Sequence, residues 1–214
     1  MTSLSGPSLS IKNPKKIVIF LHGYGANGHD LLSIGHTWQH DLPFILFTSP
    51  HAPFPCIQSP MGRQWFSIDN WNPETLRRGA NEALPFLCDY IRTLIKTHNL
   101  TLADVALVGF SQGAMMAMQC ALSSTEAFAG VVAYSGALLW PETQVPRHVP
   151  LLLIHGDQDH IVPVQAFYQA QHVLTQLNFP AHYHLIQGLG HGIDEEGLQL
   201  GLTFLKKVLG DNKI

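Results

Sequence analysis

Charged side chains are scarce in this chain, and basic ones are not concentrated anywhere along it. Asp, Glu, Lys and Arg make up 13% of the 214 residues, and the formal net charge is -3. Lys and Arg come at most in pairs, such as Lys15 and Lys16. Proteins that bind nucleic acid depend on clustered basic residues, so the composition argues against a nucleic-acid partner.

Long apolar runs are also missing. The longest, such as residues 17–21 and 114–118, contain five residues, whereas a membrane-spanning helix needs about 20. Residues 1–16 form a polar N-terminal segment without the apolar stretch of a signal peptide. We therefore expect a soluble protein with no membrane span.

Cysteine is rare. Only Cys56, Cys88 and Cys120 are present, and no two of them form a CxxC pair. This pattern argues against a disulfide framework and is typical of a reducing compartment, so we expect a cytoplasmic protein. Cys88 and Cys120 fall in helical patterns, where each is expected to be a small buried hydrophobe.

Histidine is abundant, with 13 residues, but its spacing does not predict a metal site. His36 and His40 could share a helix face, and His182 and His184 one face of a strand. A catalytic zinc needs three converging ligands, and the sequence has no HExxH motif. We expect neither a metal nor another cofactor.

Strand-like and helix-like segments alternate along the whole chain, and the length fits one domain over residues 1–214. Short apolar runs predict strands at 17–21, 44–47, 105–108, 131–134, 151–154 and 182–186. Helices are predicted at 73–98, capped by Asn72, and at 114–123, 164–177 and 195–209. The proline-rich segment 50–71 reads as a long structureless loop. Strands that are apolar on both faces favour an α/β fold, with a mostly parallel sheet and helices on both faces.

The sequence Gly109-Phe110-Ser111-Gln112-Gly113 is a GxSxG motif between a predicted strand and a predicted helix. In that context the glycines allow a tight turn that exposes the serine at the edge of the sheet. The free N–H groups at the start of the helix would stabilise an anionic intermediate. Ser111 is therefore the predicted nucleophile.

Four acidic residues between the serine and the last histidine could orient a catalytic base: Glu126, Glu142, Asp157 and Asp159. Such sites form at the carboxyl ends of strands, and only the two aspartates directly follow a predicted strand. Asp157 comes after a glycine and suits a turn. We favour Asp159 over Asp157 as the residue that orients the base, and we expect Asp157 to have a structural role in the turn.

A serine hydroxyl needs a base, and the candidate histidines after Asp159 are His160, His172, His182, His184 and His191. His172 lies in a predicted helix, and His182 and His184 in a predicted strand. His191 stands in a glycine-rich loop beyond the last strand and can reach a neighbouring strand end. His191 is the predicted general base.

Two backbone N–H groups are predicted to form an oxyanion hole. One belongs to Gln112, directly after the nucleophile, and the other to Tyr24, in the loop after the first long strand. His22, at the start of that loop, is expected to hold the loop rather than to act on substrate.

Four segments in order resemble the phospholipase/carboxylesterase family, which includes acyl-protein thioesterases: LHGYGANG at 21–28, GFSQG at 109–113, HGDQDHIVP at 155–163 and GHG at 190–192. The RQWF sequence at 63–66 resembles that family's Trp-Phe element, although Ser67 stands where an Asp often follows. The first loop looks closest to the bacterial carboxylesterase branch. The resemblance implies an α/β-hydrolase fold, a triad of Ser111, Asp159 and His191, and oxyanion amides of Tyr24 and Gln112.

These expectations describe a serine hydrolase that cleaves carboxylic esters with short to medium acyl chains, and thioesters, through an acyl-enzyme. The connections 136–149 and 50–71 are too short for a helical cap. An apolar acyl groove is expected at Trp65, Phe66, Ile161 and Val162. The partner is then an acyl ester or thioester, with an acylated protein and a homodimer left open. A peptidase or lactonase with the same triad, or a non-catalytic binding protein, remain the alternatives.

Overall fold

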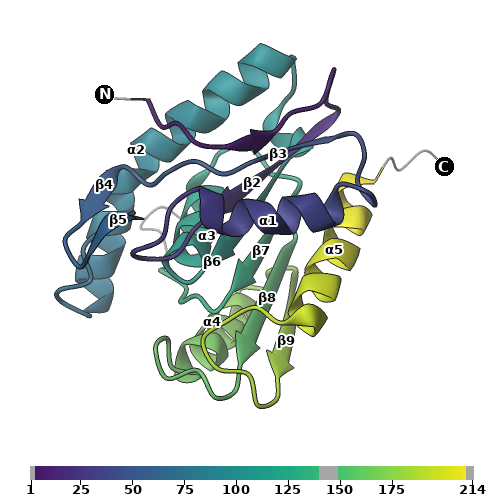
Figure 1. Ribbon diagram of the computed structural model, residues 1–214. Helices are drawn as coiled ribbons and strands as arrows, with labels where there is room; N and C mark the ends of the chain where they lie inside the picture. Colours follow the sequence, from purple (N-terminus) through teal and green to yellow (C-terminus); the bar gives the residue numbers. More distant parts are fainter. Residues whose placement is uncertain (1–2, 140–148, 211–214) are drawn as a thin grey trace.

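A seven-stranded sheet forms the centre of the computed structural model, which describes residues 3–139 and 149–210 (Figure 1). The strands follow one another across the sheet in the order β1-β3-β2-β6-β7-β8-β9. Only β1 runs antiparallel to its neighbour. Their bounds are β1 Ser8–Leu9, β2 Lys16–Leu21, β3 Ile45–Thr48, β6 Val105–Phe110, β7 Gly130–Tyr134, β8 Leu151–Gly156 and β9 Ala181–Ile186.

Helices cover both faces of this sheet (Figure 1). Two of them, α1 (His29–Trp38) and α5 (Glu195–Leu209), pack on one face. The other face is covered by α2 (Pro73–His98), α3 (Gln112–Ser123) and α4 (Gln165–Gln176). This arrangement confirms the expected α/β fold with a mostly parallel sheet.

The central strands are apolar at every position because each of their faces meets a helical layer. In β2, Ile17 and Ile19 belong to the core beneath α2 and α3, whereas Val18 and Phe20 belong to the core beneath α1 and α5. All four side chains are completely buried. The alternation of side chains along a strand therefore divides one apolar run between two cores.

The longest helix, α2, begins and ends as its sequence predicts. The Asn72 side chain accepts hydrogen bonds from the N–H groups of Glu74 and Thr75, and Pro73 occupies the first helical position. Asn99 ends the helix in the left-handed conformation, with φ 55°. Pro85 lies inside the helix, which continues past it without a break.

Three parts of the chain are more structured than expected. Segment 50–71 is not a structureless loop, because it contains an antiparallel hairpin of β4 (Phe54–Cys56) and β5 (Ser59–Gln64). The polar N-terminal segment supplies β1, which pairs with β3 and covers that edge of the sheet. Helix α1 was not predicted either.

Two sequence predictions concern residues that the structure does not describe. The connection 136–149, expected to be too short for a helical cap, is described only at its ends, because residues 140–148 are not described. Glu142, one of the four candidate acids, is among them. Within the described ranges, no helix has the length and apolar character required to cross a membrane.

Candidate active site

Ser111 lies in a sharp turn between β6 and α3. Its backbone has φ 55° and ψ −118°, a strained conformation for a residue with a side chain. The glycines on either side permit the turn. A Cβ at position 113 would lie 1.9 Å from the carbonyl oxygen of Leu21, and one at 109 would lie 2.3 Å from that of Gly113. The GxSxG pattern is thus a requirement of close backbone approach.

Backbone hydrogen bonds hold this turn in place. The Ser111 N–H donates to the Tyr134 carbonyl at 2.9 Å, which ties the turn to β7. The Ser111 carbonyl accepts from the N–H groups of Ala114 and Met115 at 3.0 and 3.1 Å, which starts α3. Ser111 and His191 both line one pocket of about 230 Å³, at the carboxyl ends of the central strands.

Asp159 follows β8 in the loop that leads to α4, and its carboxylate is completely buried. One oxygen, Oδ1, accepts hydrogen bonds from the N–H groups of Ile161 and Val162, both at 2.9 Å. The other, Oδ2, lies 2.7 Å from Nδ1 of His191. Burial alone would raise the pKa of Asp159, but the hydrogen bonds from His191, Val162 and Ile161 outweigh it and hold the pKa below its usual value.

This contact defines the tautomer of His191. Because the ionised carboxylate can only accept hydrogen bonds, Nδ1 of His191 carries the proton and Nε2 of the neutral ring is an acceptor. The ring packs on Phe110, with 4.8 Å between the ring centroids, and its side chain is 18% exposed. A neutral imidazole of this kind can take a proton from a hydroxyl group.

The loop that carries His191 approaches β8 closely. A Cβ at Gly156, the last residue of β8, would lie 2.2 Å from the carbonyl oxygen of Leu189. Asp157 strengthens the same approach, because its Oδ1 accepts the N–H of Gly188 at 2.7 Å. Asp157 therefore has a structural role, as expected, but its side chain joins two loops rather than bonding to the backbone of its own turn.

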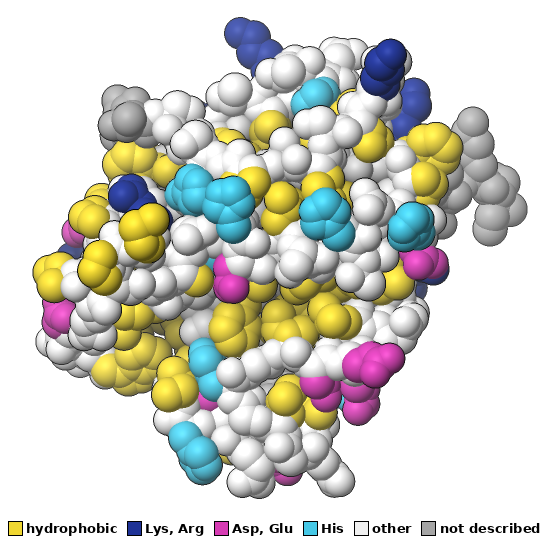
Figure 2. Space-filling view, viewed as in Figure 1, with side chains coloured by type: hydrophobic (Ala, Val, Ile, Leu, Met, Phe, Trp, Pro, Cys, Tyr) yellow, Lys and Arg dark blue, Asp and Glu magenta, His cyan; other side chains and the backbone are white. Residues whose placement is uncertain are grey.

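The other candidate histidines lie away from this contact. His184 bonds to Glu196 at 2.8 Å, and the ring of His182 packs against Phe204. His160 and His172 are exposed. Figure 2 shows histidine side chains spread across one face of the molecule rather than gathered at one point. Among the described residues, no group of three or more His, Cys, Asp or Glu side chains could hold a metal ion.

Tyr24 and Gln112 line the pocket of Ser111, as the sequence predicts for residues that flank an oxyanion. In the described parts of the chain, neither of their backbone N–H groups donates a hydrogen bond to the protein. The Tyr24 loop is held by β5. The Gly25 N–H donates to the Arg63 carbonyl at 3.0 Å, and the Arg63 N–H donates to the Ala26 carbonyl at 2.7 Å.

His22 supports the same loop from inside the protein. It is completely buried, and burial lowers its pKa to about 4, so the ring is neutral. Its Nε2 accepts the N–H of Ala52 at 3.0 Å, which leaves the Nδ1–H to donate to the Gly23 carbonyl at 2.8 Å. His22 thus joins the Tyr24 loop to the segment after β3.

Trp65 and Phe66 do not line this pocket, contrary to the expected acyl groove. They are 0% and 2% exposed and belong to the hydrophobic core. The Trp65 indole N–H donates to the His22 carbonyl at 3.0 Å. The Gln112 side chain bonds to the backbone of both residues, accepting from the Trp65 N–H at 2.8 Å and donating to the Phe66 carbonyl at 2.7 Å. The Trp-Phe element therefore braces the turn at Ser111 from behind.

Ile161 and Val162 do line the pocket. Sequence reasoning missed the other side chains of its wall: Ala26, Asp30, Ile68, Trp71, Phe110 and Met115. Most of them lie shortly after strand ends or in or near the GxSxG motif. A single sequence has no signal that shows which residues in such segments point into a pocket.

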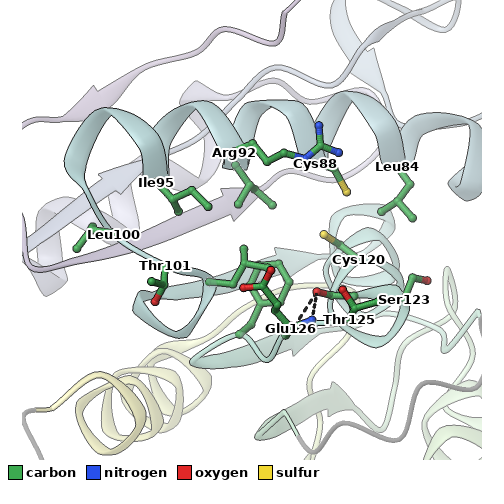
Figure 3. A pocket seen from close by; sticks show the side chains of 14 residues that line it. Leu84, Cys88, Arg92, Ile95, Leu100, Thr101, Cys120, Ser123, Thr125 and Glu126 are labelled. Atoms are coloured by element: carbon green, nitrogen blue, oxygen red, sulfur yellow. Dashed lines mark hydrogen bonds between the residues drawn. The ribbon is translucent and has the colours of Figure 1, made fainter.

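A second cavity, of about 480 Å³, lies between α2 and α3 and shares no lining residue with the pocket of Ser111 (Figure 3). Its wall includes Leu84, Cys88, Arg92 and Cys120, and the thiol groups of the two cysteines point toward one another. A hydrogen bond from the Cys120 thiol lowers the pKa of Cys88, and the charge of Arg92 acts in the same direction.

Several proteins named as esterases or thioesterases are similar to this chain in sequence or in structure. A sequence model of the phospholipase/carboxylesterase family matches residues 9–209. The acyl-protein thioesterase 1 of Gibberella zeae is 28% identical over 90% of this chain and 90% of its own. Esterase YpfH of Escherichia coli is 26% identical over 91% of this chain and 84% of its own.

A solved structure extends this similarity to three dimensions. The crystal structure of esterase PE8 is 37% identical and superposes with a TM-score of 0.91, over 97% of this chain and 100% of the other. Its match includes the parallel sheet whose strand ends carry the pocket of Ser111. The chain therefore belongs to the phospholipase/carboxylesterase family and has the α/β-hydrolase fold.

Proposed function

We propose that this protein hydrolyses carboxylic esters with short to medium acyl chains, and thioesters, through an acyl-enzyme formed on Ser111. The observation that carries the proposal is the 2.7 Å contact between His191 Nδ1 and the buried Asp159 carboxylate, at the pocket that Ser111 also lines. Hydrolase activity is consistent with the family and with relatives named esterase and acyl-protein thioesterase.

In the first step, His191 Nε2 takes the proton of the Ser111 hydroxyl while Oγ attacks the carbonyl carbon of the substrate. The negative charge that develops on the carbonyl oxygen accepts hydrogen bonds from the N–H groups of Tyr24 and Gln112. The bond to the alcohol or thiol then breaks. His191 gives the proton to this leaving group, and the acyl group stays on Ser111.

In the second step, water repeats the attack on the acyl-enzyme. His191 takes a proton from the water molecule, whose oxygen attacks the acyl carbonyl, and then returns the proton to Ser111 Oγ. The products are the carboxylic acid and the free enzyme. Throughout both steps, Asp159 holds the ring in one tautomer and stabilises its positive charge.

The pocket supports the preference for short to medium acyl chains. Its volume is about 230 Å³, and Ile68, Met115 and Val162 supply apolar surface next to Ser111. A long acyl chain exceeds this space and must extend past the exposed Ile161 into solvent.

The test is hydrolysis of p-nitrophenyl esters of rising chain length by the wild type and by Ser111→Ala. The variant should lose on the order of 10⁶ in kcat, because no other hydroxyl replaces the nucleophile. Ser135→Ala is a matched control, since Ser135 directly follows the neighbouring strand β7 with φ 50°, lies buried and does not line the pocket.

Retained activity in Ser111→Ala would contradict the assignment of the nucleophile. Turnover of amides or lactones in place of esters would favour a peptidase or lactonase with the same residues. If esters, thioesters, amides and lactones are all left unhydrolysed, the result would favour the alternative that this chain is a non-catalytic binding protein.

A further inference from the structure

The pocket of Ser111 contains one charged side chain for which the proposed reaction has no use. This is Asp30, the only acidic residue in the wall, and no Lys or Arg of the described chain lines the pocket. The carboxylate forms no ion pair or hydrogen bond with any described residue. An unpaired negative charge therefore faces a pocket that is otherwise mainly apolar.

The position of Asp30 in α1 explains in part why an acidic residue occurs there. It lies in the first turn of the helix, where a negative charge interacts favourably with the helix dipole. That interaction does not require the side chain to line a pocket, and Asp30 as a whole is exposed, so its carboxylate is open to a ligand. The part that the protein covers loses hydration, which raises the pKa of Asp30.

Aromatic rings make up much of the remaining wall. Tyr24, Trp71 and Phe110 all line the pocket. Trp71 is 50% exposed, so much of its indole surface is available to a ligand. Aromatic faces attract cations, and rings grouped around a pocket are the usual binding site for quaternary ammonium groups.

We propose that the pocket selects esters whose alcohol carries a quaternary ammonium group, held by the Asp30 carboxylate and the rings of Tyr24, Trp71 and Phe110. The proposal rests on the function proposed for Ser111. The ammonium group is assigned to the alcohol because the aliphatic side chains of Ile68, Met115 and Val162 suit the acyl chain.

A pair of substrates with the same shape tests this selection. In butyrylcholine the alcohol ends in a trimethylammonium group, and in 3,3-dimethylbutyl butyrate a neutral carbon replaces the nitrogen. The ratio of kcat/KM for the cationic ester to that for the neutral ester isolates the effect of the charge. We expect the wild type to favour butyrylcholine by about tenfold, since an exposed ion pair and a cation–π contact together contribute about this much.

Asp30→Asn should lower this ratio to near one. The control is Asp41→Asn, which removes the same charge beyond the other end of α1, where Asp41 pairs with Lys206. That control should leave the ratio unchanged. Trp71→Leu should lower the ratio as well, because it removes the most exposed ring. A wild-type ratio of one or below, or the same ratio in Asp30→Asn as in the wild type, would overturn the proposal.

A binding measurement separates this proposal from the function of Ser111. Choline chloride is titrated into the Ser111→Ala protein by calorimetry, which requires no turnover. Binding that is weakened by Asp30→Asn supports the site even if neither ester is hydrolysed. Absence of binding overturns the site, even if the neutral ester is hydrolysed and the proposed reaction is correct.

Discussion

Replacing Asp159 with asparagine is the most direct perturbation of the proposed active site. The substitution keeps the size of the side chain but removes its charge and replaces one oxygen by an NH₂ group. The remaining oxygen is expected to stay with the N–H groups of Ile161 and Val162, which donate to Oδ1. The NH₂ group then faces Nδ1 of His191, where Oδ2 lies at 2.7 Å in the wild type.

The expected loss of activity follows from the tautomer of His191. An NH₂ group can only donate, so Nδ1 must become the acceptor and the proton moves to Nε2. His191 then cannot take the proton of Ser111. The same substitution in another serine hydrolase triad lowers kcat by about 10⁴, and we expect a similar loss here.

Stability should change with a predictable dependence on pH. The folded-state pKa of Asp159 lies below its usual value, so the ionised group stabilises the fold above about pH 4. This stabilisation is lost as the pH falls through the folded-state pKa. Asp159→Asn should therefore be destabilised relative to the wild type at pH 7, by about 1–3 kcal/mol, and less so in acid.

The assay is p-nitrophenyl butyrate hydrolysis between pH 6 and 9, together with urea unfolding at pH 7 and in mild acid. Asp157→Asn is the matched control, because its oxygen can still accept the Gly188 N–H that Asp157 binds. That variant should keep nearly full activity. If kcat falls by less than about tenfold in Asp159→Asn, the reasoning from the tautomer is refuted. It is also refuted if kcat falls further in Asp157→Asn than in Asp159→Asn.

Two further predictions concern packing and reactivity. Gly113→Ala should destabilise the protein by about 3 kcal/mol or more, or prevent folding, because the new Cβ would lie 1.9 Å from the carbonyl oxygen of Leu21. Gly192→Ala meets no atom within 4 Å and should unfold in urea nearly as the wild type does; equal stabilities of the two variants would contradict this account. Iodoacetamide should label Cys88 before Cys120 in the folded protein, because Cys88 is partly exposed and its thiol pKa is lowered by the hydrogen bond from Cys120, which is itself buried. Peptide mass spectrometry at short reaction times gives the order, and earlier labelling of Cys120 would contradict the prediction.

Local patterns in the sequence were sufficient to predict most of the fold. Short apolar runs identified the central strands, and the Asn72-Pro73 pair identified the start of α2, because capping and side-chain periodicity act between near neighbours. The GxSxG motif identified the turn at Ser111. Gly109 is required there by the nearby backbone of Gly113 and Ala114, whereas Gly113 is required by the carbonyl of Leu21, which is distant in sequence.

Elements with weak local patterns were missed. The hairpin of β4 and β5 lies in a proline-rich segment, and one of its pairs joins Pro55 to Arg63. β1 is only two residues long and exists because it pairs with the edge strand β3. Such strands depend on partners distant in sequence, so periodicity alone does not reveal them.

The active site, like the fold, was predicted from the sequence only in part. The sequence by itself determined that a serine lies in a strand–helix turn and that an aspartate and a histidine follow on loops at strand ends. Only the tertiary structure decided that Asp159 rather than Asp157 contacts His191, and that Trp65 turns into the core rather than into the pocket. The direction of each side chain depends on contacts such as that between Trp65 and Gln112, 47 residues apart. Contacts of that range form only when the chain has folded.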